Sequence, residues 1–445
     1  MRFGTDGLRG PANSELTPEL ALRLGRAAAR VIDAPRWFVA RDPRRSGPML
    51  DGAVASGLAA EGVDVFDVGV MPTPGVAYLA AAHDAAAVMV SASHNPWYDN
   101  GLKIFGRGGL KLDDQTQSTI ERVLAGLAGA EVAGDPKAVG WIHRDHDSLG
   151  QYRQMLLGAL ESRSLAGLDI VIDCGHGAAS PLAGELFRAA GADVEVLHDH
   201  PDGRNINDGV GSTNPSPLAA RVVASGADLG LALDGDADRL IAVDARGNIV
   251  DGDRLLCMFA LDLAERGMLA ENTLVVTVMS NLGLHRSMAR HGIDVAVTPV
   301  GDRHVLEALA TGGWSLGGEQ SGHIVFADLA TTGDGLLAGL LLSDLIVRSG
   351  RPLGEMATEV MTTVPQLLVN IETAVRPDDP AGDLASEIAT AEQLLGSDGR
   401  VLVRSSGTEP LVRIMVESTT AEIAQRAADG LSEAVRERYG VAKAH

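Results

Sequence analysis

Three stretches of the chain repeat one pattern of apolar and polar positions. Each begins Gly-x-Asp-Val, at Gly62, Gly191 and Gly292, and continues as an alternating, largely β-branched run. A period of two predicts a strand, and the glycine before it is a signal for the C-terminal cap of a helix. Another apolar run lies upstream of each predicted helix, at residues 37–43, 168–175 and 273–280. The pattern therefore predicts three β-α-β units with parallel strands and right-handed crossovers.

Each unit then reaches a further apolar run that ends in an unusual polar loop. "AAAVMV" (85–90) ends in "SASHNP", "ADLGLAL" (227–233) ends in "DGDADR", and "WSLGG" (314–318) ends in "EQSGH". In open parallel sheets, ligands bind outside the carboxyl ends of the strands. We therefore expect the three loops to be equivalent and to converge on one cleft.

The last part of the chain has a different pattern. From about residue 368 it predicts two strands, in "VLVRSSG" and "PLVRIMVE", followed by a helix at 421–439. The predicted fold is three similar α/β domains with mixed, largely parallel sheets and a smaller C-terminal α+β domain around a central cleft. The expected domains are residues 1–150, 151–250, 251–367 and 368–445.

Composition narrows the class of protein. The chain has 445 residues and a net charge of −22, which argues against a nucleic-acid or anionic-membrane surface. No signal peptide is expected at the start, and the longest apolar stretch, "GLLAGLLLSDLIV", is too short to span a membrane and contains Asp344. Cys174 and Cys257 form no CxxC pair. We expect a cytoplasmic protein with reduced thiols.

The loop "DGDADR" is the strongest candidate metal site. Asp234, Asp236 and Asp238 occupy alternate positions, which on an extended segment point the same way, and a hard cation such as Mg²⁺ prefers their oxygens. A calcium EF-hand would need glycine and glutamate where Arg239 and Ala245 stand, so that alternative fails. The other alternative is a solvated acidic turn.

The loop "RSSGTEP" (404–410) is a candidate phosphate site. A loop rich in glycine and hydroxyl side chains can expose several backbone N–H groups to one anion, and Arg404 adds bidentate donors. An ordinary polar hairpin loop accounts for this composition equally well. In "GGEQSGH" (317–323), Glu319 could accept hydrogen bonds from sugar hydroxyls, and a structural turn is the alternative.

Two basic residues stand out near the first loops. "FGTDGLRG" (3–10) is too glycine-rich for a strand or helix, so Arg9 either reaches a phosphate or belongs to a terminal arm packed on the surface. Lys103 is one of four lysines among 37 basic residues and follows "SASHNP" in "NGLKIF". Lysine can release a proton where arginine cannot, which favours proton transfer as the role of Lys103.

Together and in this order, "SASHNP", "DGDADR", "GEQSGH" and "RSSGTEP" resemble the α-D-phosphohexomutase superfamily over nearly the whole chain. Within it the chain is most similar to the bacterial branch that acts on glucosamine phosphates. The stretches that carry this likeness are "FGTDGLRG", "SASHNPWYDNGLKIF", "VMSNLGL", "VGDRHV", "GEQSGH" and "PQLLVN". Pro299 and His304 depart from residues common in relatives, which concerns the substrate contacts of the third domain alone.

The resemblance implies a reaction and a set of site residues. Glucosamine 6-phosphate and glucosamine 1-phosphate interconvert through a phosphorylated Ser93 and a glucosamine 1,6-bisphosphate intermediate, in amino-sugar nucleotide and cell-wall precursor synthesis. The implied catalytic residues are Ser93, His94, Lys103 and Arg9, and one Mg²⁺ is held by the Ser93 phosphate, Asp234, Asp236 and Asp238. The implied substrate-binding residues are Arg239, Glu319, Ser321, Arg404, Ser406, Gly407, Thr408 and Arg413. A small sugar phosphate is the expected partner, and the resemblance allows a homodimer without requiring one.

Three other functions stay open at this point. A phosphoglucomutase or phosphomannomutase would share every motif and differ in its sugar. A Mg²⁺-dependent phosphatase with an aspartate nucleophile in "DGDADR" would leave "SASHNP" unexplained. A sugar-phosphate-binding protein without catalysis would need the glycine-rich loops but not both Ser93 and the three aspartates.

Overall fold

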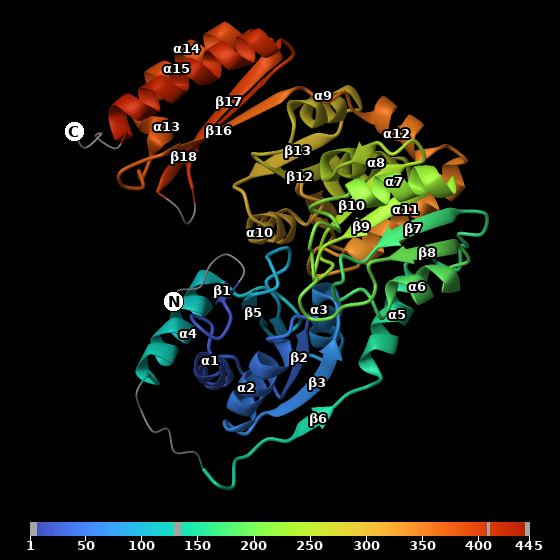
Figure 1. Cartoon of the computed structure of the whole chain (residues 1–445), viewed down its shortest axis with the longest axis vertical. Helices are drawn as coiled ribbons and strands as arrows, with labels where there is room; N and C mark the ends of the chain where they lie inside the picture. Colours follow the sequence, from blue (N-terminus) through green and yellow to red (C-terminus); the bar gives the residue numbers. More distant parts are fainter. Residues whose placement is uncertain (1–6, 129–134, 407–409, 441–445) are drawn as a thin grey trace. The chain divides into compact units, whose positions relative to one another are not determined.

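The computed structural model describes residues 7–128, 135–406 and 410–440 (Figure 1). The chain divides into two compact units, which we describe separately. The first unit holds residues 1–277 and 294–359, and the second holds residues 278–293 and 360–445. Of the four sheets that the described residues form, the first unit contains three and the second contains one.

The first sheet has six strands in the order β1-β5-β4-β2-β3-β6. Strands β2, β3, β4 and β6 run parallel, whereas β5 pairs antiparallel with both β4 and β1. The bounds are β1 Leu8–Pro11, β2 Arg36–Arg41, β3 Asp64–Val70, β4 Ala86–Val90, β5 Asp99–Phe105 and β6 Ile142–Arg144.

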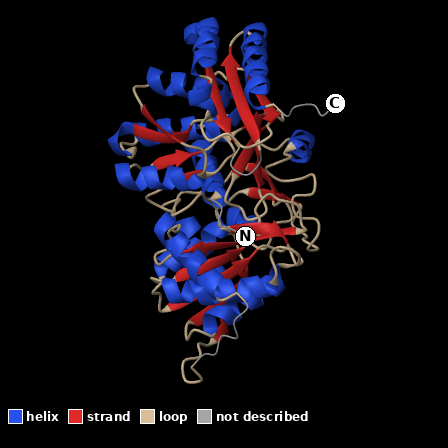
Figure 2. Cartoon of the chain, turned by 90° about the vertical axis from the view of Figure 1, so that its left-hand side faces the viewer, coloured by secondary structure: helices blue, strands red, loops and turns tan. Residues whose placement is uncertain are grey.

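Helices cover both faces of the first sheet, and the alternation of β2 shows why. Trp37 and Val39 belong to one apolar core with α1 and α2, while Phe38 and Ala40 belong to another with α3. A strand with both faces apolar fits this burial on two sides. The helices are α1 Pro18–Val31, α2 Gly47–Ala59, α3 Thr73–Ala82, α4 Asp114–Gly126 and α5 Ser148–Gly158. Figure 2 shows how helices and strands alternate through the chain.

The second and third sheets repeat the arrangement of the first. Their strand orders are β11-β10-β9-β7-β8 and β13-β12-β14-β15. The strands are β7 Asp169–Asp173, β8 Asp193–Leu197, β9 Leu229–Leu233, β10 Leu240–Asp244, β11 Ile249–Val250, β12 Thr273–Thr277, β13 Asp294–Thr298, β14 Leu316–Gly318 and β15 Ile324–Phe326. The helices are α6 Ala183–Ala189, α7 Ser216–Ser225, α8 Gly252–Glu265, the 3₁₀ turn Ala270–Asn272, α10 Asp302–Gly312, α11 Gly335–Ser349 and α12 Leu353–Val360.

The predicted β-α-β repeat is confirmed. The pairs β2/β3, β7/β8 and β12/β13 are parallel, and α2, α6 and α9 (Leu282–Arg290) connect them. Strands β4, β9 and β14 lie on the other side of β2, β7 and β12, and each turns back into an antiparallel partner, β5, β10 or β15. The three polar loops are therefore the same hairpin connection in three copies.

The second unit contains an antiparallel sheet in the order β16-β18-β17. Helix α15 packs against β16 and β18, and α14 packs against β17, so one face of the sheet carries the core. Helix α9 belongs to this unit, where the N–H of Leu282 donates to the buried carboxylate of Glu417. The remaining bounds are β16 Gln366–Glu372, α13 Pro380–Asp383, α14 Ala385–Leu395, the 3₁₀ turn Gly396–Asp398, β17 Gly399–Ser405, β18 Leu411–Ser418 and α15 Ala421–Tyr439. The predicted fold class, three α/β domains and a C-terminal α+β domain, is confirmed.

The expectation that the glycine-rich N-terminal segment forms no strand is wrong for residues 8–11. These residues form β1, in which Arg9 lies opposite Gly101 of β5. A Cβ at Gly7 would lie 2.2 Å from the carbonyl oxygen of Leu102 in β5, so glycine there allows the close approach of the two segments. Pairing with β5 therefore overrides the weak local propensity.

The state of the two cysteines agrees with the prediction from the sequence. Cys174 and Cys257 are buried and unbonded to each other, as predicted. Burial raises the pKa of the Cys174 thiol, which keeps it protonated. No helix in the described part of the chain has both the length and the apolar character needed to cross a bilayer.

Candidate active site

Ser93 lies in the loop between β4 and β5 in a strained backbone conformation. Its φ of +52° is in the left-handed region, which costs a residue other than glycine about 1–3 kcal/mol. Its Oγ donates a hydrogen bond to Asp234 Oδ2 at 2.5 Å, and its N–H donates to Ser91 Oγ at 2.9 Å. The loop thus aims the Ser93 hydroxyl at the acidic loop of the second sheet, while Ser91 supports it from behind.

His94 lies beside the serine hydroxyl. Its Nδ1 is 3.3 Å from Ser93 Oγ. On an extended segment these adjacent side chains would point opposite ways, but the positive φ of Ser93 excludes an extended backbone here. Burial, followed by the charges of Arg239 and Arg9, lowers the pKa of His94 to about 4. The imidazole is therefore neutral at physiological pH, and its low pKa makes it a weak base.

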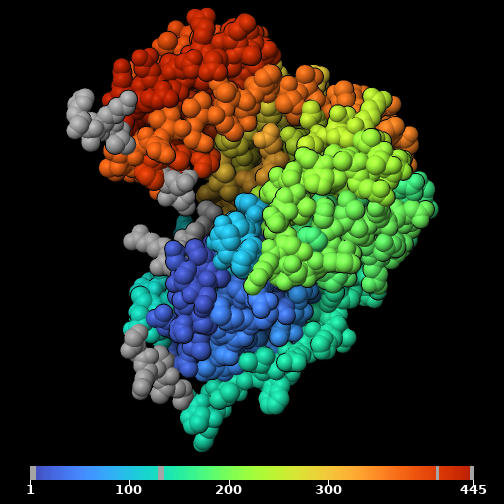
Figure 3. Space-filling model, in the orientation of Figure 1, coloured from blue at the N-terminus to red at the C-terminus, as the bar shows by residue number. Residues whose placement is uncertain are grey.

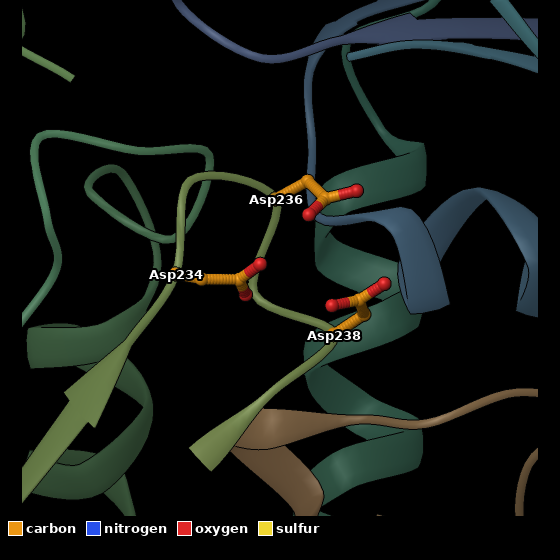
Figure 4. A group of neighbouring side chains, drawn as sticks. All are labelled: Asp234, Asp236 and Asp238. Carbon is orange, nitrogen blue, oxygen red and sulfur yellow. The ribbon is translucent and has the colours of Figure 1, made fainter. Parts of the chain in front are cut away.

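The three aspartates of the loop after β9 converge, as Figure 4 shows. Oxygen atoms of Asp234, Asp236 and Asp238 lie within 4.8 Å of one another, and all three residues are buried. The prediction that they share one direction is confirmed, but its reason is wrong. The loop is a turn with Ala237 at φ +57°, rather than an extended segment with alternating side chains.

The electrostatics of this acidic loop favour a cation. Burial, then the charges of Asp238 and Asp236, raises the pKa of Asp234 well above its ordinary value. Asp238 Oδ1 is buried and accepts no hydrogen bond from any residue that the structure describes, although Arg239 Nε lies 3.7 Å away. Three carboxylates with an oxygen left unsatisfied suit a hard divalent ion. The residues therefore fit a metal site.

Two side chains of the first-sheet domain reach the acidic loop. Lys103, buried in β5, places Nζ 2.7 Å from Asp236 Oδ2 and 3.5 Å from Asp238 Oδ2. Thr73, the first residue of α3, donates from Oγ1 to Asp236 Oδ2 at 2.5 Å and from its N–H to the Asp236 carbonyl. In the space-filling view, the blue segment of the first sheet and the green segment of the second are in contact (Figure 3).

The third loop joins this group through Arg239 and Glu319. The N–H of Leu240 donates to the carbonyl of Gly322 at 2.9 Å, which links the second and third loops. Burial disfavours the charged form of Arg239, but the nearby carboxylates, Asp238 first and Glu319 among them, outweigh it and raise the pKa of Arg239. Glu319 is half-buried and accepts a hydrogen bond from the Gly301 N–H at 3.1 Å, whereas Ser321 is exposed.

The candidate phosphate site of the second unit contains two facing arginines. Arg404 of β17 lies directly opposite Arg413 of β18. Burial and then the charge of Arg413 lower the pKa of Arg404, and like charges at such a position destabilise a sheet unless an anion offsets them. Ser406 is buried, and its N–H donates to the Leu411 carbonyl. Gly407 and Thr408 lie outside the described residues.

Sequence reasoning missed several residues that shape the site. Thr73, Arg44 and Asn207 bind the acidic loop or the serine loop, yet each lies in a stretch without a distinctive pattern. Arg44 is one of three closely spaced arginines, and only its complete burial distinguishes it. His323 was within the quoted "EQSGH" and is buried, with Nε2 3.6 Å from Asp302 Oδ2.

Comparison with known proteins assigns the family. The sequence matches the three α/β/α domains of the phosphoglucomutase/phosphomannomutase family at residues 1–128, 150–247 and 251–364, and its C-terminal domain at 365–434. It is 52% identical to the phosphoglucosamine mutase of Rhodococcus opacus and to that of Mycobacterium tuberculosis, over 97% of this chain and 98% of each relative. The chain belongs to the phosphoglucosamine mutases of the phosphohexomutase superfamily. It is an intramolecular phosphotransferase of that family.

Solved structures agree with the fold of a phosphoglucosamine mutase. A phosphoglucomutase/phosphomannomutase family protein from Burkholderia thailandensis superposes with a TM-score of 0.82 at 28% identity and covers 97% of both chains. An N-acetylphosphoglucosamine mutase from Aspergillus fumigatus, solved with GlcNAc-6P and magnesium, gives a TM-score of 0.69 at 18% identity over 98% of this chain and 96% of its own. At that identity the second comparison supports the fold alone.

Proposed function

We propose that this phosphoglucosamine mutase interconverts glucosamine 6-phosphate and glucosamine 1-phosphate through a phosphoryl group carried on Ser93 Oγ. The observation that carries the proposal is the 2.5 Å hydrogen bond from Ser93 Oγ to Asp234 within the acidic loop. A serine hydroxyl held on a buried group of metal-binding carboxylates is suited to carrying a phosphoryl group. A phosphatase with an aspartate nucleophile would have no use for this strained serine.

The first transfer runs from the protein to the sugar. The 1-hydroxyl oxygen of glucosamine 6-phosphate attacks the phosphorus, the bond from phosphorus to Ser93 Oγ breaks, and glucosamine 1,6-bisphosphate forms. The sugar hydroxyl loses one proton and Ser93 Oγ gains one, so charge and atoms balance. The bisphosphate then reorients within the site without dissociating, and Ser93 Oγ attacks the phosphorus of the 6-phosphate. Glucosamine 1-phosphate leaves, and the phosphoserine is restored.

Asp234, Asp236 and Asp238 would hold one Mg²⁺ beside the Ser93 phosphate. When bound, Mg²⁺ offsets the charge that develops on the phosphoryl oxygens. The chain supplies the rest from its own residues. Thr73 orients the Asp236 carboxylate, Arg239 adds positive charge next to the aspartates, and Glu319 and Ser321 would bind sugar hydroxyls.

The proton in each transfer is assigned to Lys103, with His94 as the alternative. We expect Lys103→Arg to lower kcat by about 10²–10⁴-fold, because arginine keeps the charge but cannot release a proton. Lys103 Nζ contacts Asp236 and Asp238, so neutralising those carboxylates is a competing role that arginine would largely preserve. Steady-state kinetics at saturating substrate separate the two. A near-normal kcat in Lys103→Arg would leave Lys103 with charge neutralisation and give the proton to His94, which lies 3.3 Å from Ser93 Oγ.

The phosphate that does not react is assigned to Arg404, Ser406, Gly407, Thr408 and Arg413. We expect Arg404→Ala to raise KM about 10–100-fold with a small change in kcat, because this contact exists in ground and transition states alike. Arg426→Ala, at an exposed position of α15, is the matched control for a lost positive charge on the same unit. Equal KM values for the two variants would mean that "RSSGTEP" is an ordinary hairpin loop.

The sugar is tested by comparing kcat/KM for glucosamine 6-phosphate, glucose 6-phosphate and mannose 6-phosphate with one preparation. The proposal predicts the highest value for the amino sugar. A higher value for either neutral sugar would make the chain a phosphoglucomutase or phosphomannomutase in practice.

We also propose the division into domains at 1–150, 151–250, 251–367 and 368–445, a cytoplasmic location, and a homodimer as an arrangement to be tested by its mass in solution.

A further inference from the structure

Arg44 is a completely buried arginine behind the serine loop. Its Nη2 donates to the carbonyl oxygens of Ser93 at 2.7 Å and of Asn95 at 2.9 Å. Its Nη1 donates to the carbonyl of Asp99 at 3.1 Å and to that of Pro96. One guanidinium thus gathers four carbonyl groups of the segment that carries the reactive hydroxyl.

Asp42 fixes the guanidinium in turn. Its Oδ2 accepts from Arg44 Nε at 2.8 Å and from Ser91 Oγ at 2.6 Å, and Ser91 Oγ accepts from the Ser93 N–H. The carbonyl and the N–H of Ser93 are therefore both held from the end of β2. A buried charge pair that is fully hydrogen-bonded in this way holds its neighbours in one geometry.

Asn207 holds the same loop from the second-sheet domain. Its Nδ2 donates to the Ser93 carbonyl at 2.9 Å and lies 3.4 Å from the Asn95 carbonyl, so it shares both acceptors with Arg44. Its own N–H donates to the Gly175 carbonyl just after β7. A Cβ at Gly235 would lie 2.5 Å from the Ser93 carbonyl oxygen and 2.8 Å from Asn207 Nδ2, so the acidic loop closes over this contact.

We propose that Arg44 and Asn207 are positioning residues that clamp the Ser93 carbonyl from the two domains and so keep Ser93 Oγ on the acidic loop. The left-handed φ of Ser93 needs such support, because an unrestrained serine favours other conformations. Arg44 holds the loop to the first sheet, and Asn207 couples it to the domain that carries the aspartates. This inference rests on the proposed role of Ser93.

The test compares Asn207→Ala with Asn205→Ala. Asn205 is in the same segment, and its side chain bonds only locally in the described structure, to the His200 carbonyl and the Asp202 N–H. We expect Asn207→Ala to lower kcat by about 10–100-fold, with KM and the melting temperature close to those of Asn205→Ala. Similar kcat values for the two variants, a loss confined to KM, or a melting temperature that falls with kcat would each overturn the proposal.

A second measurement follows the phosphoserine directly by ³¹P NMR. We expect its resonance to shift or broaden in Asn207→Ala and in Arg44→Lys, and to stay unchanged in Asn205→Ala. The kcat losses of Asn207→Ala and Arg44→Lys should be non-additive in the double variant, because both side chains bind one oxygen. A wild-type protein that gains no phosphoserine resonance after incubation with glucosamine 1,6-bisphosphate would refute the proposed function itself. A normal resonance that neither variant alters would refute the clamp alone.

Discussion

Ser93→Ala is expected to lower kcat by on the order of 10⁴–10⁶-fold, the size of loss seen when a covalent nucleophile is removed. Without Oγ no phosphoryl group can be carried, and the neighbouring hydroxyl cannot replace it. Ser91 is fully buried, and its Oγ is bonded to Asp42 and to the Ser93 N–H. The measurement is a coupled assay of glucosamine 1-phosphate formation, together with intact-mass analysis for the phosphoryl group.

Ser91→Ala is the control within the same loop. It removes a hydroxyl that supports Ser93 but carries no phosphoryl group, so we expect a much smaller loss of kcat and a phosphorylated protein. The melting temperature of Ser93→Ala should stay near that of the wild type, since its Oγ bonds mainly to a side chain of the acidic loop. Turnover near normal in Ser93→Ala would refute the phosphoserine mechanism.

Asp236→Ala is expected to lower kcat by about 10²–10³-fold, and removing the metal with a chelator should cause at least as large a loss. Asp236 is buried, and Thr73 Oγ1 and Lys103 Nζ both contact its carboxylate. Asp33→Ala, at an exposed position, matches the change in charge without touching the loop. Full turnover after chelation, with Mg²⁺ shown to be absent, would contradict the metal assignment.

In metal-free protein, we expect a substitution in the acidic loop to raise stability although it lowers activity. Burial and neighbouring carboxylates raise the pKa of Asp234, so the metal-free folded chain loses stability as pH rises above the ordinary aspartate pKa. Asp234→Asn removes the charge of this carboxylate, so the metal-free variant should have a higher melting temperature than the metal-free wild type at neutral pH. A variant that loses activity while gaining stability separates a functional carboxylate from a structural one.

The repeated architecture was readable from the sequence because its signals are local. Glycine caps and period-two runs identified the three parallel pairs, and the polar loops after β4, β9 and β14 were recognisable by composition. The turn geometry of those loops was not readable. Ser93 and Ala237 adopt positive φ, which serine and alanine do not favour intrinsically, so tertiary contacts impose it.

Residues that act through long-range contacts were the hardest to predict. Lys103 was singled out for its place after the serine loop, but its contacts are with Asp236 and Asp238, more than a hundred residues away. Arg44 and Asn207 lie in loops of two different domains and bind one carbonyl oxygen, and neither has a motif of its own. Backbone carbonyls carry no sequence signature, so their partners become visible only in the fold.

The central claim, transfer of a phosphoryl group between Ser93 and the sugar, is tested most directly in a single turnover. Protein with phosphorylated Ser93 is mixed with glucosamine 6-phosphate in slight excess, and protein-bound phosphate and sugar phosphates are followed in time. The account predicts that one phosphoryl group per chain passes to the sugar as glucosamine 1,6-bisphosphate, at a rate no slower than kcat. Release of inorganic phosphate without bisphosphate, or a phosphoryl group found on Asp234, Asp236 or Asp238, would contradict it.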